Sequence, residues 1–319
     1  MSPLAHVEVT IHFYFKQIKK KYSKVSLFRF FYIFLRFDLF NMSKKRILYI
    51  TPAIFPYLPE SYISTICRYL PQGIQERENE IRTFMPKYGL INERKNMLHE
   101  VIRLSGQNII IEDTDYPLII KVASLQSVRM QVYFIDSDDF FRRKALFTDE
   151  NDVFFEDNDS RALFFAKGVI ETVRKLGWNP DIIHCHGWLS ALIPIFIRTV
   201  YKDNPLFQDV RIVTSIYNDY FSEKFSPNFL KKLKITGVPR EHLSHFKGVS
   251  GYDTIIKTAI DFSDATIVAH PNITPSLKKY LKKYEHPTLL HPETEDYLEY
   301  VDEYNHFYEE LLELLPREF

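Results

Sequence analysis

Two histidines and a tryptophan stand close together near the middle of the chain, in the stretch DIIHCHGW at 181–188. Side chains two residues apart on a strand point to the same side, so His184 and His186 should face one way at the carboxyl end of a strand. In open α/β sheets, ligands sit in the crevice at that edge. A neutral imidazole there can donate a hydrogen bond to a ligand hydroxyl group.

The same residues also have structural interpretations. A histidine at a strand end can simply be held by a backbone carbonyl, and Trp188 can pack in the core instead of shaping a binding groove. A metal site built on His-x-His needs a third ligand that the sequence does not place, so no metal is expected. Cys185 alternates to the opposite face and should belong to the core.

The elements that would position these residues alternate along the chain. Short apolar runs predict buried strands at 47–51, 80–85, 181–186, 210–215 and 265–269. Amphipathic or capped segments predict helices at 61–77, 160–176, 189–201, 249–262 and 275–284. Alternating strands and helices imply a parallel sheet with right-handed crossovers.

Residues 97–148 change character. Val101–Leu104, Asn108–Glu112, Leu118–Ala123 and Met130–Ile135 are β-rich runs broken by glycine, aspartate and proline, which predicts a β-hairpin insertion. The acidic stretch that follows, 149–159, is predicted to be a solvated loop. It lacks the central glycine and the spacing of a calcium-binding loop.

The last part of the chain, 286–319, predicts an acidic amphipathic helix. Its apolar and aromatic residues recur at spacings of three and four between Tyr297 and Leu315. Such a helix needs a partner surface. Docking on its own domain is favoured over dimerisation or a foreign partner.

Composition narrows the class of protein. The 319 residues suggest one large or two small domains, at roughly 150 residues per domain. Two cysteines cannot form a disulfide framework, which indicates a reducing, cytoplasmic location. A formal net charge of zero argues against nucleic acid, and the basic clusters at 231–234 and 278–283 are predicted to be solvated helix faces.

Residues 1–41 differ from the rest because they carry seven basic and two acidic residues and many aromatic ones. Their apolar run is interrupted by Arg29, Arg36 and Asp38, so a membrane span is not expected. We expect an extension that is either unstructured or a false start ahead of Met42. A membrane-surface anchor is the alternative.

Several blocks in order carry a resemblance to a known family. The chain resembles the amino-terminal half of the catalytic region of bacterial glycogen synthases and plant starch synthases over roughly 42–285. The blocks are RILYITP at 46–52, LPQGIQERENEIRTFMPKYG at 70–89, VYFID at 132–136, DNDSR at 157–161, GWNPDIIHCHGW at 177–188, and FSDA followed by VAHP within 262–271.

The resemblance implies an α/β fold class, namely a single Rossmann-like lobe of a two-lobe glycosyltransferase. It also implies transfer of glucose from ADP-glucose to an α-1,4-glucan with retention. The second histidine of the family's H-x-H-D-W motif, which lies beside the transferred glucose, maps onto His186. His184, Trp188 and Asn218 are further sugar-binding candidates, and Lys257 is the candidate for binding the donor.

The chain departs from the family pattern at four places where the family's motifs bind the donor or the sugar. The family's K-T-G-G-L loop, which approaches the donor phosphates, is replaced by AIFPYLPESY at 53–62, without lysine or glycine. Gly187 replaces the aspartate of H-x-H-D-W, Tyr217 replaces the histidine of an I-H-N-type sequence, and Lys257 lacks the glycines of K-G-G-I. About 35 residues follow Glu285, too few for a second lobe.

These features predict three parts: an extension (1–41), a starch-synthase-like lobe (42–285) and a carboxyl-terminal helix (286–319). We expect a glycosyltransferase domain without self-sufficient activity and with no cofactor. ADP-glucose or an α-glucan is the expected ligand, with a protein partner that supplies a second lobe. The alternative is a non-catalytic module that binds a glucan or a protein.

Overall fold

The computed structural model describes residues 44–314 apart from 126–127, 249 and 295. The predicted extension 1–41 therefore lies outside the described residues. From Lys45 onward the chain forms one compact unit.

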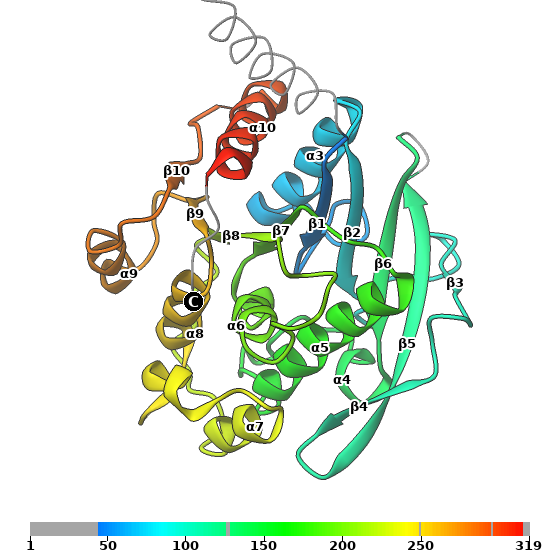
Figure 1. Ribbon diagram of the computed structural model, residues 1–319. Coiled ribbons are helices and arrows are strands. Elements are labelled where there is room, and N and C mark those ends of the chain that lie inside the picture. The colour runs from blue at the N-terminus through cyan, green and yellow to red at the C-terminus, as the bar shows by residue number, and fades with distance from the viewer. Residues whose placement is uncertain (1–43, 126–127, 249, 295, 315–319) are drawn as a thin grey trace, which may run out of the picture. The chain divides into compact units, whose positions relative to one another are not determined.

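A ten-stranded mixed sheet lies at the centre of this unit (Figure 1). Its spatial order is β10-β9-β8-β7-β1-β2-β6-β5-β3, with β4 paired to β5. The strands are β1 (Arg46–Ile50), β2 (Glu80–Pro86), β3 (His99–Glu100), β4 (Gln107–Ile111), β5 (Thr114–Leu125), β6 (Met130–Asp136), β7 (Ile182–His186), β8 (Arg211–Ile216), β9 (Ala265–Val268) and β10 (Thr288–Leu290). Pairing from β10 to β6 is parallel, and β5 pairs antiparallel with β6, β4 and β3.

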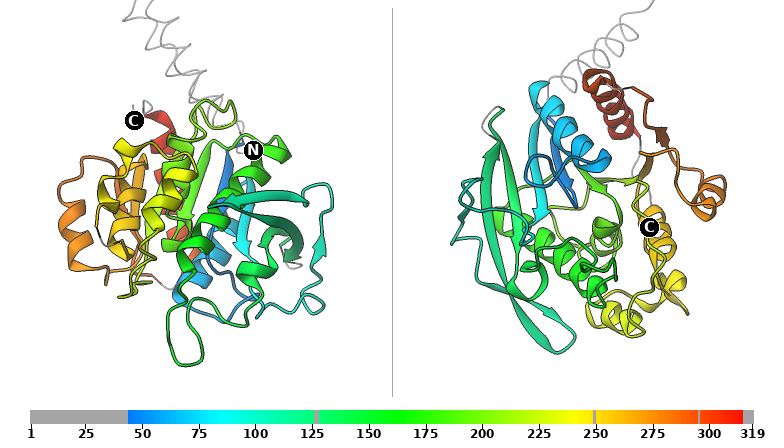
Figure 2. Two further views of the ribbon diagram at one scale, coloured as in Figure 1. Left: turned by 90° about the horizontal axis from the view of Figure 1, so that it is seen from below. Right: turned by 180° about the vertical axis from the view of Figure 1, so that it is seen from behind.

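Helices cover both faces of the sheet (Figure 2). They are α3 (Tyr62–Glu76), α4 (Asp138–Phe141), α5 (Asn158–Leu176), α6 (Ile193–Arg198), α7 (Phe229–Ile235), α8 (Tyr252–Asp261), α9 (Pro275–Leu281) and α10 (Tyr297–Glu313). Apolar side chains of α3 and α10 pack on one face, and those of α5, α6 and α8 pack on the other. The predicted α/β, Rossmann-like lobe with a hairpin insertion is confirmed.

Three local predictions need correction. Val101–Leu104 is a series of turns, and only the two residues before it pair with β5. The helix predicted over 189–201 is shorter, since α6 starts with Pro194 in its first turn, where a missing amide is tolerated. The edge strand β10 was not predicted, because two of its three side chains are exposed and show no buried pattern.

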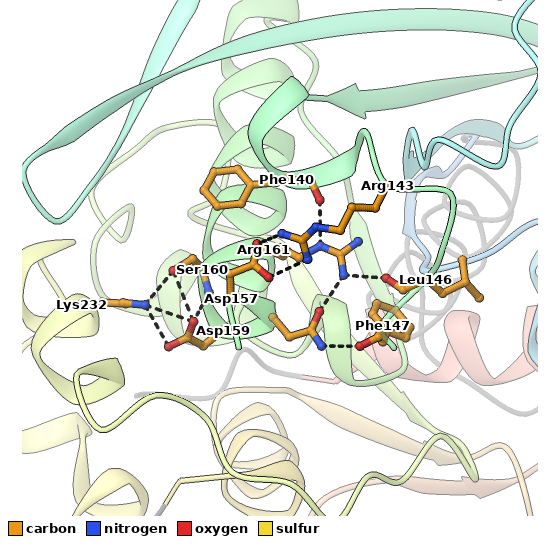
Figure 3. A network of polar contacts seen from close by, with 10 residues as sticks. Phe140, Arg143, Leu146, Phe147, Asp157, Asp159, Ser160, Arg161 and Lys232 are labelled. Atoms are coloured by element: carbon orange, nitrogen blue, oxygen red, sulfur yellow. Dashed lines mark hydrogen bonds and ion pairs between the residues drawn. The ribbon is translucent and has the colours of Figure 1, made fainter. Parts of the chain in front are cut away.

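The start of α5 is fastened by buried charges (Figure 3). Lys232 of α7 lies 3.1 Å from both carboxylate oxygens of Asp159 and 2.7 Å from the Ser160 hydroxyl. Arg161 is fully buried and donates to the carbonyls of Phe140 at 2.9 Å and Leu146 at 2.5 Å. The basic cluster at 231–234 is therefore not wholly solvated as predicted.

The acidic loop before α5 is largely solvated, since Glu150, Asp152 and Glu156 are exposed, whereas Asp159 at its end is buried. Asp157 pairs with Arg143, and Asp149 accepts backbone N–H groups from Asn151 and Val153. These contacts lie within the segment 142–157, and the bond from Arg161 to the Leu146 carbonyl ties that segment to α5. Among the residues that the structure describes, no group of three or more histidines, cysteines or acids is arranged to hold a metal ion.

Candidate functional site

The two histidines at the end of β7 lie side by side, with ring centroids 3.9 Å apart. Both side chains are fully buried on the face of the sheet that α3 and α10 cover. They point to the same side, as their spacing predicts. Cys185 points to the opposite face and is fully buried, as expected of a core residue.

Each imidazole has polar neighbours of its own. His184 Nδ1 lies 2.7 Å from the Tyr308 hydroxyl, and its Nε2 lies 2.7 Å from the Ser215 hydroxyl. His186 Nδ1 lies 2.8 Å from the Tyr217 hydroxyl. His186 Nε2 is buried and has no hydrogen-bond partner among the described residues.

Burial keeps both rings neutral at ordinary pH. It lowers the pKa of His186 from 6.5 to about 3. Burial, reinforced by repulsion from the neighbouring ring, places the pKa of His184 well below its usual value. These rings can donate and accept hydrogen bonds, but they are poor proton carriers near neutral pH.

Helix α10 packs against His184, the first histidine of this pair. Tyr304 and Tyr308, both fully buried, lie against the His184 ring with centroids 6.1 and 5.8 Å away. The same helix packs on α3, where Tyr69 stacks on Tyr297. The carboxyl-terminal helix thus docks on its own domain, and it covers the His184 ring.

Trp188 is also buried. Its ring contacts Phe147, Phe154, Phe221 and Phe225, with centroids between 4.7 and 6.1 Å away. Of the two interpretations offered for Trp188, packing is the one that describes this arrangement. Its backbone N–H, in the turn after His186, donates to Asp219 Oδ2 at 2.8 Å.

The other two candidate residues lie in different surroundings. Asn218 is exposed in the loop after β8. Lys257 of α8 donates to the Ser276 hydroxyl at 2.8 Å and lies 3.9 Å from Asp253. No hydrogen bond or ring contact in the described part of the chain joins Lys257 to His184 or His186. The roles of all five candidate residues stay predictions.

The first loop after β1 turns apolar side chains inward. Ala53, Ile54, Tyr57 and Leu58 are buried, and burial raises the pKa of Tyr57 to about 12. Ser61 caps α3. This loop therefore presents no lysine and no glycine amide, and its only charged residue is the exposed Glu60.

Sequence reasoning missed Asp219. Its carboxylate accepts the backbone N–H of Trp188 at 2.8 Å and the hydroxyl of Tyr252 at 2.7 Å. It therefore lies directly beside Gly187, where the H-x-H-D-W pattern would place a carboxylate. In the sequence, only the presence of an aspartate 31 residues after Trp188 could have indicated this contact.

A cavity of about 730 Å³ lies at the same edge of the sheet, between α9, β10 and the start of α3. Tyr62, Ile273 and Leu281 line it, with Lys278 and Lys282 on α9. None of the five predicted site residues lines this cavity.

The sequence predicted a parallel sheet with a hairpin insertion and with paired histidines at the end of one strand, and the structure has these features. Residues 46–286 match the family model described as the starch synthase catalytic domain. The chain belongs to this family.

Curated relatives of this family member include two bacterial glycogen synthases. That of Chlorobium limicola is 40% identical over 176 residues, which cover 55% of this chain and 36% of the relative. That of Chlorobium phaeobacteroides is 35% identical over 229 residues, which cover 69% of this chain and 46% of the relative. The chain thus spans less than half the length of these relatives.

A solved structure shares the fold. The catalytic domain of starch synthase IV from Arabidopsis thaliana, bound to ADP and acarbose, superimposes with a TM-score of 0.62 at 18% identity. The match covers 78% of this chain and 52% of that one. No helix within the described residues is both long enough and apolar enough to cross a bilayer.

Proposed function

We propose that this chain is a glycosyltransferase lobe for the transfer of glucose from ADP-glucose to an α-1,4-glucan. We also propose that the chain does not catalyse this transfer by itself. Residues 42–285 would form the lobe, 286–319 would add the covering helix, and 1–41 would be an extension. The reducing compartment suggested by its cysteines would be the cytoplasm.

The loop at 53–60 is the observation that carries this proposal. A pyrophosphate needs close backbone amides and a cation. This loop instead buries four apolar side chains, contains two prolines without amides and ends in an exposed glutamate. The exposed Glu60 would repel phosphate. In this proposal the donor phosphates are held by a partner that supplies a nucleotide-binding lobe.

A transfer assay with radiolabelled ADP-glucose and glycogen tests this. The purified chain should incorporate no label, while the glycogen synthase of Chlorobium phaeobacteroides serves as the positive control under the same conditions. Titration calorimetry should detect ADP binding only with a co-purifying partner present. Robust turnover by the chain alone would refute the proposal.

The buried histidines favour a second candidate, a non-catalytic module that binds a glucan or a protein. His186 is fully buried and its neighbour His184 is covered by Tyr304 and Tyr308, so a sugar could reach the pair only after a structural rearrangement. Affinity electrophoresis in glycogen distinguishes the two. If the His186→Ala variant binds as wild type does, the glucan surface lies elsewhere and the second candidate is favoured. A protein-binding role would instead predict that deleting residues 290–319 abolishes partner pull-down.

A further inference from the structure

The turn that follows β7 has a backbone that strongly favours glycine. Gly187 has φ 69° and ψ 178°, a region that side-chain-bearing residues rarely enter. A Cβ atom built on Gly187 would lie 2.5 Å from Asp219 Oδ2 and 3.2 Å from Ile63 Cδ1. The space beside residue 187 is therefore already filled by a carboxylate that comes from a different strand.

Asp219 joins three segments at the carboxyl edge of the sheet. Its Oδ2 accepts the backbone N–H of Trp188 in the turn after β7, and its Oδ1 accepts the hydroxyl of Tyr252 on α8. Asp219 itself follows β8. The same Tyr252 hydroxyl lies 3.0 Å from the Tyr217 carbonyl, which draws α8 and the β8 loop together.

These bonds hold the turn in a defined place. Hydrogen bonds to an ionised carboxylate are stronger than neutral ones. The Gly187 N–H donates to the Ser215 carbonyl at 3.1 Å, and the Ser190 hydroxyl donates to the carbonyls of His186 and Gly187. Asp219 thus accepts the N–H of Trp188, while the other backbone groups of this turn bond to Ser215 and Ser190.

We propose that Asp219 supplies, from the loop after the neighbouring strand, the carboxylate that the H-x-H-D-W pattern carries at position 187. In this arrangement Asp219 is a positioning residue for the turn from His186 to Trp188. The inference rests on the proposed function only in treating this turn as part of the carbohydrate-facing edge.

If Asp219 takes the place of a carboxylate at position 187, substitutions of Gly187 and Asp219 should have coupled effects on the melting temperature. Gly187→Asp should lower the melting temperature by roughly 5 °C or more, because the new carboxylate meets that of Asp219 on a strained backbone. Asp219→Ala should also lower it, since the Trp188 amide loses its acceptor. The double variant should melt higher than Gly187→Asp alone, because the new carboxylate enters the space that Asp219 vacates.

A matched glycine separates this coupling from backbone strain. Gly177 also has a positive φ, 60°, but no atom lies within 4 Å of a Cβ built on it. Gly177→Asp and Asp219→Ala should therefore act independently on the melting temperature. If the Gly187→Asp/Asp219→Ala variant does not melt above the Gly187→Asp single variant, the exchange of positions is refuted.

A spectroscopic signal tests the positioning role directly. The chain has two tryptophans, so ¹⁵N-tryptophan labelling gives two backbone amide signals. The Trp188 amide proton shift should follow the ionisation of Asp219 as the pH is lowered and should lose that dependence in Asp219→Asn. Burial raises the pKa of Asp219, and the titratable groups that face it are the phenols of Tyr217 and Tyr252.

The backbone amide of Trp178 is the comparison signal, because Trp178 precedes β7 whereas Trp188 and Asp219 lie beyond the carboxyl ends of β7 and β8. An unchanged Trp188 profile in Asp219→Asn would overturn the assignment. Neither measurement contains a glucan or a nucleotide sugar. A negative result for the role of Asp219 can therefore be distinguished from a negative result for the proposed function, which the transfer assay tests.

Discussion

At the scale of single residues, the paired imidazoles at the end of β7 are buried, neutral and largely hydrogen-bonded. Desolvation explains why: a protonated ring would lose its hydration without gaining a carboxylate, and no described acid forms an ion pair with His184 or His186. Burial thus suppresses proton transfer by His184 and His186 and leaves them able only to form hydrogen bonds.

This setting predicts acid sensitivity. The folded pKa of His186, about 3, lies below its ordinary 6.5, so the unfolded state binds the extra proton first. Its contribution to stability is complete above about pH 6.5 and is lost as the pH falls towards 3. Between about pH 7 and about pH 4.5, His186 alone should lower the free energy of unfolding by about 2–3 kcal/mol.

Urea unfolding at a series of pH values measures this loss. His186→Gln should reduce the steepness of the acid limb, while the remaining slope from His184 persists. His306→Gln is the matched control, because that side chain is exposed at the surface of α10. Equal slopes for wild type and His186→Gln would contradict the assignment of a buried neutral ring.

At the scale of elements, the packing of α10 on α3 accompanies its contact with His184. Gly73 allows this packing, since a Cβ built on it would lie 2.7 Å from Val301 Cγ1, and Val301 is fully buried. The α3 helix therefore tolerates a residue of low helix propensity because the neighbouring helix needs the room.

Gly73→Ala should accordingly destabilise the chain. Alanine favours a helix interior by about 1 kcal/mol over glycine, but overpacking a tight contact costs about 1–3 kcal/mol. Adding Val301→Ala should recover part of the loss, so that the two changes together cost less than the sum of their separate effects. Chemical denaturation of the four proteins gives this cycle, and a stabilising Gly73→Ala would show that α10 does not press on α3.

At the scale of the whole unit, the sheet has a protected centre and weak edges. Every residue of β7 and β8 is buried, whereas both residues of β3 and two of three in β10 are exposed. Local opening is easiest where few apolar contacts hold the backbone. The site edge at β7 and β8 is therefore built on the most rigid part of the sheet.

Hydrogen exchange should reproduce this order. Amides of β7 and β8 should exchange only through global unfolding, and those of β10 should exchange at least roughly a hundredfold faster through local opening. Peptide-resolved mass spectrometry can compare the segments containing 182–186 and 288–290. Equal protection of both segments would mean that β10 is an integral part of the core.

Much of this architecture follows from local patterns in the sequence. Apolar runs and helical spacings identify the parallel strands and most of the flanking helices, and the ordered blocks identify the family. Such patterns involve neighbouring residues, whose spacing is fixed by the period of a strand or a helix. Even there, Pro194 shortened α6, and the three residues of β10 gave no pattern to detect.

Local patterns in the amino-acid sequence are sufficient to predict the fold class, the family and the place of His184 and His186 at a strand end. The contact of α10 with His184 and the position of Asp219 beside Gly187 are visible only in the folded chain. The first contact joins residues 124 positions apart and the second joins loops 31 positions apart. Contacts of that kind depend on how strands are ordered and helices are docked, which no local spacing records.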